Sequence, residues 1–505
     1  MKTISKSAAT ALTALATLMG SALASGLTAA TANAETVFRF GHPVGEGGKE
    51  TLDPIHTNRF YYAIQPIYNR LVRIDAEGRP EPSLSERWEP SDDASKWTFY
   101  LRRGVKFHDG SDFEAKDVVD LFARIKDPKY ESPLASALAL VDFVEKVNTH
   151  TVTFHLTSGH ADFPLLLVDY RVRITPSGTG DTIGTTGIGT GPFKLKTLDA
   201  VGTTVLVRND DYWEGSPKVD RIEIIGIPDA QARVQAMQAG QIDWLLSVSA
   251  QQAPLFANNP AVVTQTFPSG DWKGIAFNTE EEPYGDPRVR KALRMVVDRE
   301  AMVALVVGEG GGTVSCDTPV SPQDQYRADF NCPPDAEGAK SLLAEAGFPD
   351  GIDIEVSTSD LDQHWVNIAE VYQQQASAAG IRVKVNMEPS DGFWGDVWMK
   401  HPAFLTWWST RPADQILNEA FRSGGSWNES RYGNKEFDAT LDMARQAYSF
   451  DERVKLYRQA QEMLFEEGGT LIPYHLNVTR VLAKNIGGFA EVDDLHLRWH
   501  LISKE

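Results

Sequence analysis

Between residues 275 and 387 the sequence alternates short strand patterns with amphipathic helix patterns. Strand patterns at 275–278, 352–357 and 383–387 are separated by helix patterns at 287–297, 336–346 and 363–379. Parallel strands need a crossover connection, which is usually a helix. The alternation therefore predicts an α/β fold with parallel strands in this part of the chain.

The remainder of the chain shows the same mixture of elements. Further strand patterns lie at 37–41, 97–101, 105–107, 151–156, 192–196, 203–208, 221–227 and 471–475, and helix patterns lie at 61–71, 230–239, 451–466 and from 115 onward. The texture changes near 268–274, and a second crossing between halves is expected near 475–480. We predict a mixed α/β protein with a structural boundary at these two places.

The first 34 residues have the pattern of a secretory signal peptide. Lys2 and Lys6 precede an apolar stretch, which ends at the small residues Ala32 and Ala34. We expect cleavage after Ala34 and a periplasmic location, with no lipid attached at that point. The 471 residues that remain exceed the roughly 250–300 that one core supports, so two or three packed units are expected.

Charge and cysteine content narrow the possible functions. The formal net charge of −20 argues against nucleic acid and anionic membranes as partners. The two cysteines, Cys316 and Cys332, lie sixteen positions apart in a segment without histidine. In an oxidising compartment such a pair is expected to form a disulfide, worth roughly 3 kcal/mol in the chain-entropy model.

Seven sequence blocks occur in a fixed order along the chain. They are PSLSERWE at 82–89, WTFYLRRGVKFHDG at 97–110, FEAKDVV at 113–119, GTGPF at 189–193, NDDYW at 209–213, GQID at 240–243 and DPRVRKAL at 286–293. On these blocks the chain resembles solute-binding protein family 5, the peptide, dipeptide and nickel-type receptors of bacterial ABC importers.

The resemblance implies a two-lobed periplasmic binding protein of type II, cluster C, with an extra domain inserted in the first lobe. We expect lobe I at 35–79, 176–272 and 478–505, the inserted domain at 80–175 and lobe II at 273–477. The partners implied are a small-molecule or peptide ligand and ABC permease subunits with separate ATPases; a monomer without a cofactor is expected.

An enzyme is the main alternative to a receptor. The sequence contains no GxSxG or HExxH motif, no GxxxxGK[ST] motif and no evident cysteine nucleophile, although a glycosidase pair of carboxylates is not excluded by composition. His108, before Asp109 and Gly110, suits a turn or cap better than a metal site because no partner histidine is suitably spaced. We expect binding without chemistry.

The ligand is expected near residues 406–414, TWWSTRPAD. In peptide-binding members an aspartate in this region holds the amine of the peptide, and Arg411 stands at the aligned position. Arg411 would instead hold a carboxylate in a bidentate pair, while Asp414 could still serve an amine. In the opposite interpretation Arg411 pairs with Glu419 or Asp414 and contacts no ligand.

Other candidates surround this loop. Strand alternation would place Arg171 and Arg173 on one face, where with Arg411 they would form a cationic site, although a solvated strand edge is the alternative. Only one of Trp407 and Trp408 can face a cleft. Asn58, Tyr61 and Trp272 complete the predicted ligand contacts. Clustered arginines suit an acidic peptide, a metal chelate, another polycarboxylate or an opine-like conjugate.

Overall fold

The computed structural model describes residues 35–44, 48–75, 78–249, 251–390, 392–489 and 497–505. The predicted signal peptide at 1–34 lies outside these residues. All helices and strands of the described residues belong to the unit Thr36–Glu505. None of these helices is both long enough and apolar enough to cross a membrane.

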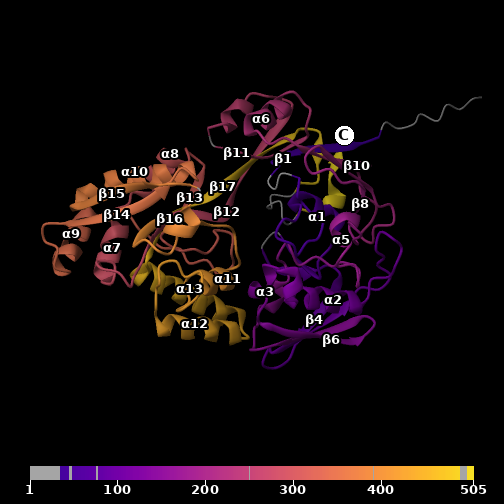
Figure 1. The fold of residues 1–505 in the computed structure, drawn as a ribbon, viewed down its shortest axis with the longest axis horizontal. Coiled ribbons are helices and arrows are strands. Elements are labelled where there is room, and N and C mark those ends of the chain that lie inside the picture. The colour runs from indigo at the N-terminus through magenta and orange to yellow at the C-terminus, as the bar shows by residue number, and fades with distance from the viewer. Residues whose placement is uncertain (1–34, 45–47, 76–77, 250, 391, 490–496) are drawn as a thin grey trace, which may run out of the picture. The chain divides into compact units, whose positions relative to one another are not determined.

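The largest sheet among the described residues has eleven strands in the order β15-β14-β16-β12-β17-β11-β1-β10-β9-β8, with β13 paired to β17 (Figure 1). The strands are β1 Val37–His42, β8 Phe193–Thr197, β9 Thr203–Arg208, β10 Arg221–Gly226, β11 Trp244–Val248, β12 Val262–Phe277, β13 Gly312–Val314, β14 Ile352–Ser359, β15 Ile381–Glu388, β16 Ala403–Trp408 and β17 Thr470–Ala483.

Parallel pairs occur near both ends of this sheet. β14 is parallel to β15 and to β16, and β1 is parallel to β10 and β11. The predicted parallel strands are therefore confirmed between 352 and 387, whereas the strand pattern at 275–278 lies in β12, which is antiparallel to both β16 and β17. The crossover between β14 and β15 is α10, Gln363–Ala376, whose Trp365, Ile368 and Tyr372 are buried in the core shared with these strands.

Two long antiparallel strands, β12 and β17, connect the two groups of parallel strands. The first half of β12 pairs with the second half of β17, from Val262 opposite Ala483 to Pro268 opposite Asn477. After a register shift, Trp272 pairs with His475 on β17 and with Trp408 on β16. The predicted boundary near 268–274 is thus the irregular middle of one continuous strand.

Smaller sheets complete the strands. A four-stranded antiparallel sheet has the order β4-β5-β7-β6, with β4 Ser85–Pro90, β5 Lys96–Leu101, β6 Val141–Asn148 and β7 Thr151–Leu156. The pairs β2 Val72–Ile74 with β3 Pro80–Pro82 and β18 Ile486–Gly487 with β19 Ser503–Lys504 are short. The four-stranded sheet packs on α2 in a core that also includes Leu71 and Val72. The limits predicted for the inserted domain, 80–175, remain a prediction.

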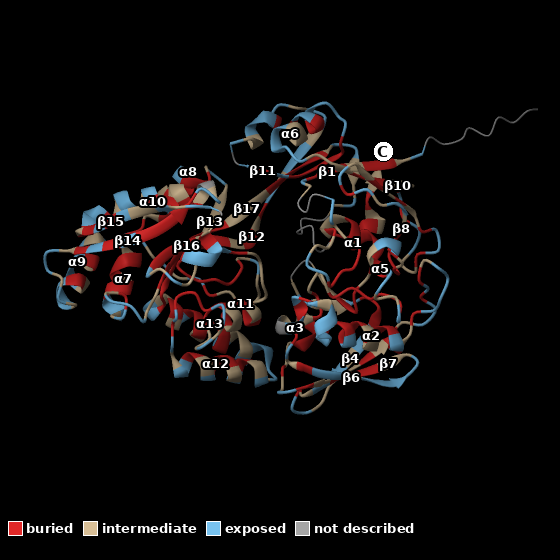
Figure 2. Ribbon diagram, viewed as in Figure 1, coloured by how far each residue is buried: buried red, intermediate tan, exposed pale blue. Residues whose placement is uncertain are grey.

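The helices are α1 Tyr61–Ile67, α2 Ala115–Lys126, α3 Leu134–Ala137, α4 Phe163–Leu166, α5 Ile183–Thr186, α6 Ala230–Gln238, α7 Pro287–Met295, α8 Arg299–Val306, α9 Ala336–Glu345, α10, α11 Ala413–Ala420, α12 Lys435–Gln446 and α13 Phe450–Glu467. Several begin after an aspartate that accepts a hydrogen bond from a first-turn amide, for example Asp229, Asp286 and Asp335. Figure 2 shows the buried strands covered by helices whose outer faces are exposed.

Three local predictions were wrong. The helix from 61 ends at Ile67, because Tyr68 is extended and Pro66 already removes one amide donor. The pattern at 105–107 forms only an isolated bridge between Lys106 and Asp112. Residues 169–173 form a turn and irregular chain, with the Val172 amide donating to the Asp169 carbonyl, so the strand alternation assumed for Arg171 and Arg173 does not apply.

Candidate ligand-binding site

The carboxyl ends of the parallel strands β14, β15 and β16 lie beside the N-terminus of α10. In open α/β sheets such an edge is where ligands bind. Here Lys273 of β12 forms an ion pair with Asp362 and donates to His364 Nδ1 at 3.0 Å. Burial and the Lys273 charge lower the pKa of His364, so that this imidazole is neutral near pH 7.

The two adjacent tryptophans at the end of β16 face opposite ways, as strand alternation predicts. Trp408 is buried, stacked near Trp272 at 6.4 Å and in edge contact with Trp427 at 5.7 Å. Trp407 lies opposite Lys273 across the strand pair and is 46% exposed. Trp407 is thus the indole that can meet a ligand, whereas Trp408 and Trp272 belong to the core beneath it.

A buried carboxylate, Glu429, fixes this strand end from below. Its oxygens accept hydrogen bonds from Trp398 Nε1 at 2.6 Å, Thr406 Oγ1 at 2.6 Å and Trp408 Nε1 at 3.1 Å. Burial raises the pKa of Glu429, although the three donors act in the opposite direction. Sequence reasoning missed Glu429, because nothing local to its position indicates that three distant donors converge on it.

Arg411 lies in the loop that connects β16 to α11. Its Nη1 donates to Ser409 Oγ at 2.6 Å and to the Thr410 carbonyl at 3.1 Å, and its side chain is 23% exposed. Its nearest acid is Glu419, at 3.7 Å from Nε, and Nε makes no hydrogen bond to any described residue. The predicted pairing with Glu419 is therefore present but loose, and Arg411 retains donor capacity.

The same loop is tied to the irregular middle of β12. Asp271 Oδ1 accepts hydrogen bonds from the Thr410 amide at 2.7 Å and from Thr410 Oγ1 at 2.8 Å. The Gly270 amide in turn donates to Thr410 Oγ1 at 3.0 Å. The position of Arg411 is thus coupled to the point where the strand register shifts.

The turn at 169–172 brings a second arginine toward Arg411. Arg171 Nε donates to Asp169 Oδ1 at 2.9 Å, and Arg171 Nη2 binds Asp169 Oδ2. Burial alone would raise the pKa of Asp169, but Arg171, with a smaller contribution from Arg411, holds it below its usual value. The charge of Glu419 also acts on Arg171, so the two ion pairs Asp169–Arg171 and Arg411–Glu419 lie within electrostatic range of one another.

Aromatic side chains flank this turn. The Tyr170 ring lies 4.8 Å from the Arg59 guanidinium and 5.2 Å from the ring of Tyr61, at the start of α1. Tyr61 also meets Tyr62 edge-on at 4.8 Å. Asn58, just before Arg59, is half-buried, and its backbone amide donates to His56 Nδ1. The structure thus places Tyr61 beside the turn that carries Arg171.

Arg173 does not join these groups. It is 5% exposed and donates to the carbonyls of Tyr170 and Tyr68, both at 2.9 Å. The expected cationic site of three arginines is therefore reduced to Arg171 and Arg411, each already near an acid.

Asp414 is also unlike the free acid that the amine hypothesis requires. Its carboxylate binds Arg445 through two hydrogen bonds at 2.8 and 2.9 Å, Tyr457 at 2.9 Å and His160 at 3.1 Å. Burial would raise the pKa of Asp414, but His160 and Arg445 hold it far below its usual range. With these partners in place, the carboxylate has little room for a ligand amine.

His160 belongs to a short docking segment, residues 160–162, that joins the four-stranded-sheet region to α11–α13. The Ala161 amide donates to the Arg445 carbonyl at 2.7 Å, and Asp162 forms an ion pair with Arg453 at 3.1 Å. The Tyr326 hydroxyl also donates to Asp162. Sequence reasoning missed this docking segment, because its partners lie more than 150 residues away.

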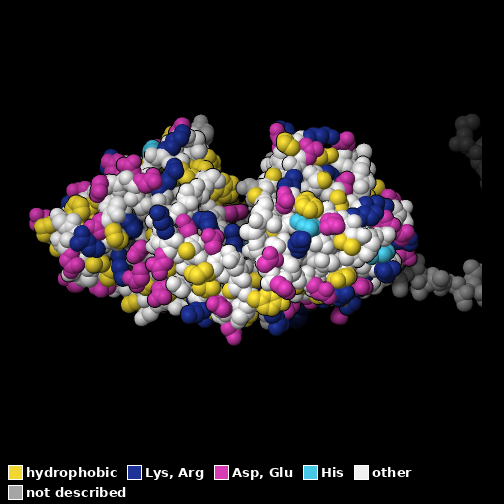
Figure 3. Space-filling model, turned by 90° about the horizontal axis from the view of Figure 1, so that it is seen from below, with side chains coloured by type: hydrophobic (Ala, Val, Ile, Leu, Met, Phe, Trp, Pro, Cys, Tyr) yellow, Lys and Arg dark blue, Asp and Glu magenta, His cyan; other side chains and the backbone are white. Residues whose placement is uncertain are grey.

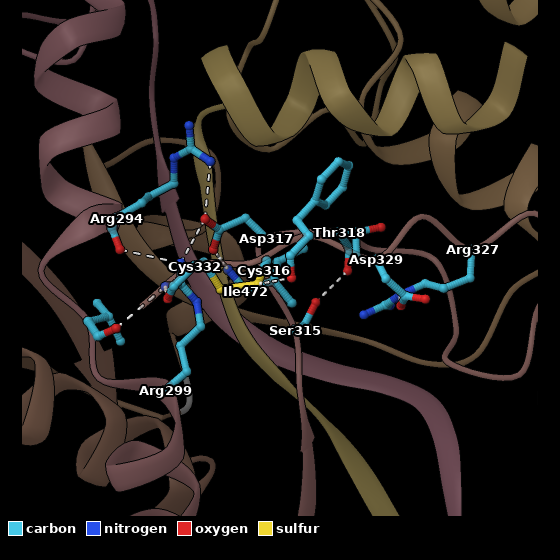
Figure 4. Close-up of a disulfide and its surroundings, with 12 residues drawn as sticks. Arg294, Arg299, Ser315, Cys316, Asp317, Thr318, Arg327, Asp329, Cys332 and Ile472 are labelled. Atoms are coloured by element: carbon cyan, nitrogen blue, oxygen red, sulfur yellow. Dashed lines mark hydrogen bonds and ion pairs between the residues drawn. A yellow bond between two sulfur atoms is a disulfide. The ribbon is translucent and has the colours of Figure 1, made fainter. Parts of the chain in front are cut away.

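The predicted disulfide between Cys316 and Cys332 is confirmed, with Cα atoms 5.8 Å apart. Beside it, Asp317 accepts from Arg294 at 3.1 Å, from Arg299 at 2.8 Å and from the Ile472 amide at 3.0 Å (Figure 4). The disulfide and this buried carboxylate together fasten the loop to the start of β17.

No group of three or more His, Cys, Asp or Glu side chains suited to a metal ion occurs among the described residues. His108 fills a structural role: its Nδ1 accepts from the Gly189 amide at 3.2 Å and its Nε2 lies 3.0 Å from the Gly191 carbonyl. Burial lowers the pKa of His108 to about 4. The surface in Figure 3 carries interspersed acidic and basic side chains.

Parallel strands toward both ends of one sheet, joined by two long antiparallel strands, define a mixed α/β fold. Residues 79–428 match the family model for bacterial extracellular solute-binding proteins, family 5. The chain belongs to this family, whose members are receptors of ABC importers.

Two curated relatives and one solved structure illustrate the similarity. Heme-binding protein A of Haemophilus influenzae is 31% identical, with 85% of each chain covered. Di/tripeptide-binding protein 2 of Pseudomonas aeruginosa is 28% identical, with 88% of this chain and 91% of the relative covered. The structure of HbpA2 from Haemophilus parasuis is 26% identical, covers 93% of this chain and all of that chain, and has a TM-score of 0.83. The relatives named are binding proteins, and the fold is the two-lobed periplasmic binding protein fold.

Proposed function

We propose that this protein is the periplasmic receptor of an ABC importer and that it captures a carboxylate-bearing solute of peptide size without chemical change. The position and loose pairing of Arg411 are the observation that supports a carboxylate-bearing ligand. It lies at the carboxyl end of β16, it is partly exposed, and its nearest acid is 3.7 Å away. A ligand carboxylate can replace the loose contact with Glu419 by a closer charge-assisted hydrogen bond.

The charges near Arg411 favour closure around a carboxylate ligand. The two ion pairs Asp169–Arg171 and Arg411–Glu419 together have zero net charge. When a ligand carboxylate pairs with Arg411, Glu419 loses its contact with Arg411. The charge of Glu419, which already acts on Arg171, then acts on Arg171 more strongly. Ligand capture would thus be coupled to attraction across the site instead of repulsion.

Movement is proposed to occur about the irregular middles of β12 and β17. The register shift between Pro268 and Trp272 interrupts their ladder, and Asp271 in that interval holds the Arg411 loop through Thr410. A ligand that contacts both predicted lobes binds only their closed arrangement and shifts the population toward it. X-ray scattering should then show a smaller radius of gyration with ligand than without it.

Two ligand types share the carboxylate and differ in shape. The name of the Pseudomonas relative indicates di- and tripeptides, which fit a site with one polar anchor. The name of the Haemophilus relative indicates heme, a flat molecule with two carboxylates, for which the exposed face of Trp407 offers a stacking surface. We favour the peptide class because Arg411 is the loosely paired cation of this site, whereas Arg171, which a second carboxylate would need, is already bound by Asp169.

Mass spectrometry of the small molecules released by denaturing the purified protein would identify a co-purified ligand. Titration with glutathione, a tripeptide with two carboxylates, and with peptides amidated at the C-terminus tests the role of the carboxylate. Hemin is tested by its absorption spectrum. Saturable binding of hemin with no response to any peptide would replace the peptide class with the tetrapyrrole class.

Arg411→Ala should weaken binding of the carboxylate ligand by about 1.5–3 kcal/mol, because a charge-assisted contact is lost. Isothermal titration calorimetry measures this change. Arg422→Ala is the matched control, since Arg422 is similarly exposed and pairs with Asp442 at 2.8 Å on α12. Equal affinities for Arg411→Ala and the unmodified protein would remove Arg411 from the site.

A further inference from the structure

A small, partly open cavity lies away from the Arg411 loop, in the region of α1 and the C-terminal segment. Its volume is about 50 Å³. The lining includes Gln65 of α1, Arg173, Tyr212 and Trp499. Because a cavity of only about 10–15 Å³ can hold a water molecule, this cavity has room for a small ion or a few water molecules.

Gln65 is aimed at this cavity without a protein partner. It is 3% exposed, and neither its amide oxygen nor its amide nitrogen bonds to any described residue. The indole Nε1 of Trp499, also buried, has no acceptor among the described residues. Buried polar groups of this kind are normally satisfied, so the cavity is expected to contain a species that binds them.

The charge of Arg173 limits what that species can be. Its two hydrogen bonds go to neutral carbonyls, and no carboxylate of the described residues lies within ion-pair distance of it. An arginine stays protonated in proteins, and a buried charge without a counter-charge is strongly unfavourable. Neutral water would satisfy the hydrogen bonds but would not compensate this charge.

The other charged groups around the cavity do not supply the missing anion. Glu214 already accepts from Arg73 and from the Tyr212 hydroxyl, at 2.7 and 2.8 Å. Arg73 and Arg498 share Glu81. The three arginines Arg73, Arg173 and Arg498 are therefore accompanied by two carboxylates, Glu81 and Glu214.

We propose that this cavity is a binding site for a small inorganic monoanion of about the size of chloride. The anion accepts hydrogen bonds from Arg173 and from the Gln65 amide nitrogen. Because Arg173 follows directly on the turn that carries Asp169 and Arg171, the bound anion fixes the base of that turn. This site is separate from the proposed solute site and does not depend on it.

Crystals grown or soaked in sodium bromide test the site directly. An anomalous peak in the cavity beside Arg173 is the expected result. In solution, the melting temperature should rise saturably, by about 2 °C or more, in chloride or bromide compared with gluconate at equal ionic strength, because gluconate is too large to enter. No cavity peak, together with equal melting temperatures in chloride and gluconate, would overturn the proposal and leave a water-filled cavity.

Variants separate the cavity from general salt effects. Arg173→Met should abolish both the bromide peak and the chloride-dependent rise in melting temperature. Gln65→Leu, which keeps the charge of Arg173, should weaken the apparent affinity for chloride at least about threefold. Gln65→Leu serves if Arg173→Met does not fold. Arg382→Ala, which removes an exposed arginine paired with Asp353, should leave the rise unchanged. An undiminished chloride response in Gln65→Leu would contradict the assignment.

Discussion

At the scale of single residues, Glu429 shows how one buried acid can order several aromatic side chains. Its two oxygens accept from Trp398, Thr406 and Trp408, and Trp408 in turn supports the strand end that presents Trp407. All three partners are donors, so a group at this position must be able to accept through both of its oxygens.

Glu429→Gln should destabilise the protein by about 1–3 kcal/mol, because the amide nitrogen cannot accept and leaves a buried donor unpaired. Urea unfolding followed by tryptophan fluorescence measures the change. Glu337→Gln is the control: Glu337 is exposed on α9, so its replacement should stay within about 0.5 kcal/mol of the unmodified protein. A Glu429→Gln protein as stable as this control would mean that the three hydrogen bonds contribute little.

At the scale of elements, two of the seven sequence blocks are found to fit together. His108, in the block at 97–110, binds the backbone of Gly189 and Gly191, in the block at 189–193. A Cβ atom at Gly189 would lie 2.1 Å from the Ile67 carbonyl oxygen, at the end of α1. Glycine is needed here because the GTGPF segment passes directly against the α1 backbone.

Gly189→Ala should therefore destabilise the protein by about 1–3 kcal/mol or more, since the clash is with backbone and cannot be relieved by a rotamer change. Thermal unfolding by circular dichroism is the measurement. At Gly395 an added Cβ meets no atom within 4 Å, so Gly395→Ala provides the comparison. Equal loss of stability in the two variants would show that close approach to Ile67 is not the reason for the glycine.

At the scale of the whole unit, the docking segment joins regions that are far apart in sequence. Asp414 of α11 lies at the centre of its contacts, with Arg445, Tyr457 and His160 around one carboxylate. The buried charge is compensated within the protein, so this cluster holds the four-stranded-sheet region against α11–α13. The contact lies outside the proposed solute site and would have to break if the predicted lobes separate widely.

Asp414→Asn should lower the free energy of unfolding by about 3–5 kcal/mol at pH 7, because Arg445 loses its buried partner. The folded protein holds the pKa of Asp414 below the unfolded value of about 3.9. The difference from the unmodified protein should thus be full above about pH 5 and shrink as the pH falls below about 4.

Urea unfolding between pH 3 and pH 7 measures this dependence. Asp442→Asn, which removes the half-exposed partner of Arg422, should show a much smaller difference. A stability difference for Asp414→Asn that does not change with pH would contradict the assignment of the charged carboxylate to this cluster.

Local patterns in the sequence determined the elements, because hydrophobic periods of 2 and 3.6 residues report which face of a strand or helix is buried. Strand β14, helix α10 and strand β15 were predicted in this way, as was the opposite orientation of Trp407 and Trp408. The disulfide followed from the expected compartment and the separation of the two cysteines. The ordered blocks were sufficient for the family.

Only the tertiary structure decided which charged groups meet. Arg171 pairs with Asp169 in a turn that the pattern presented as a strand, Arg173 is buried beside a cavity, and Asp414 binds Arg445 and His160. The physical reason is that an ion pair depends on distance in space, and residues 160 and 414 carry no local signal of each other. The sequence alone thus determined the elements and the family, while the long-range packing decided which candidate residues stay available to a ligand.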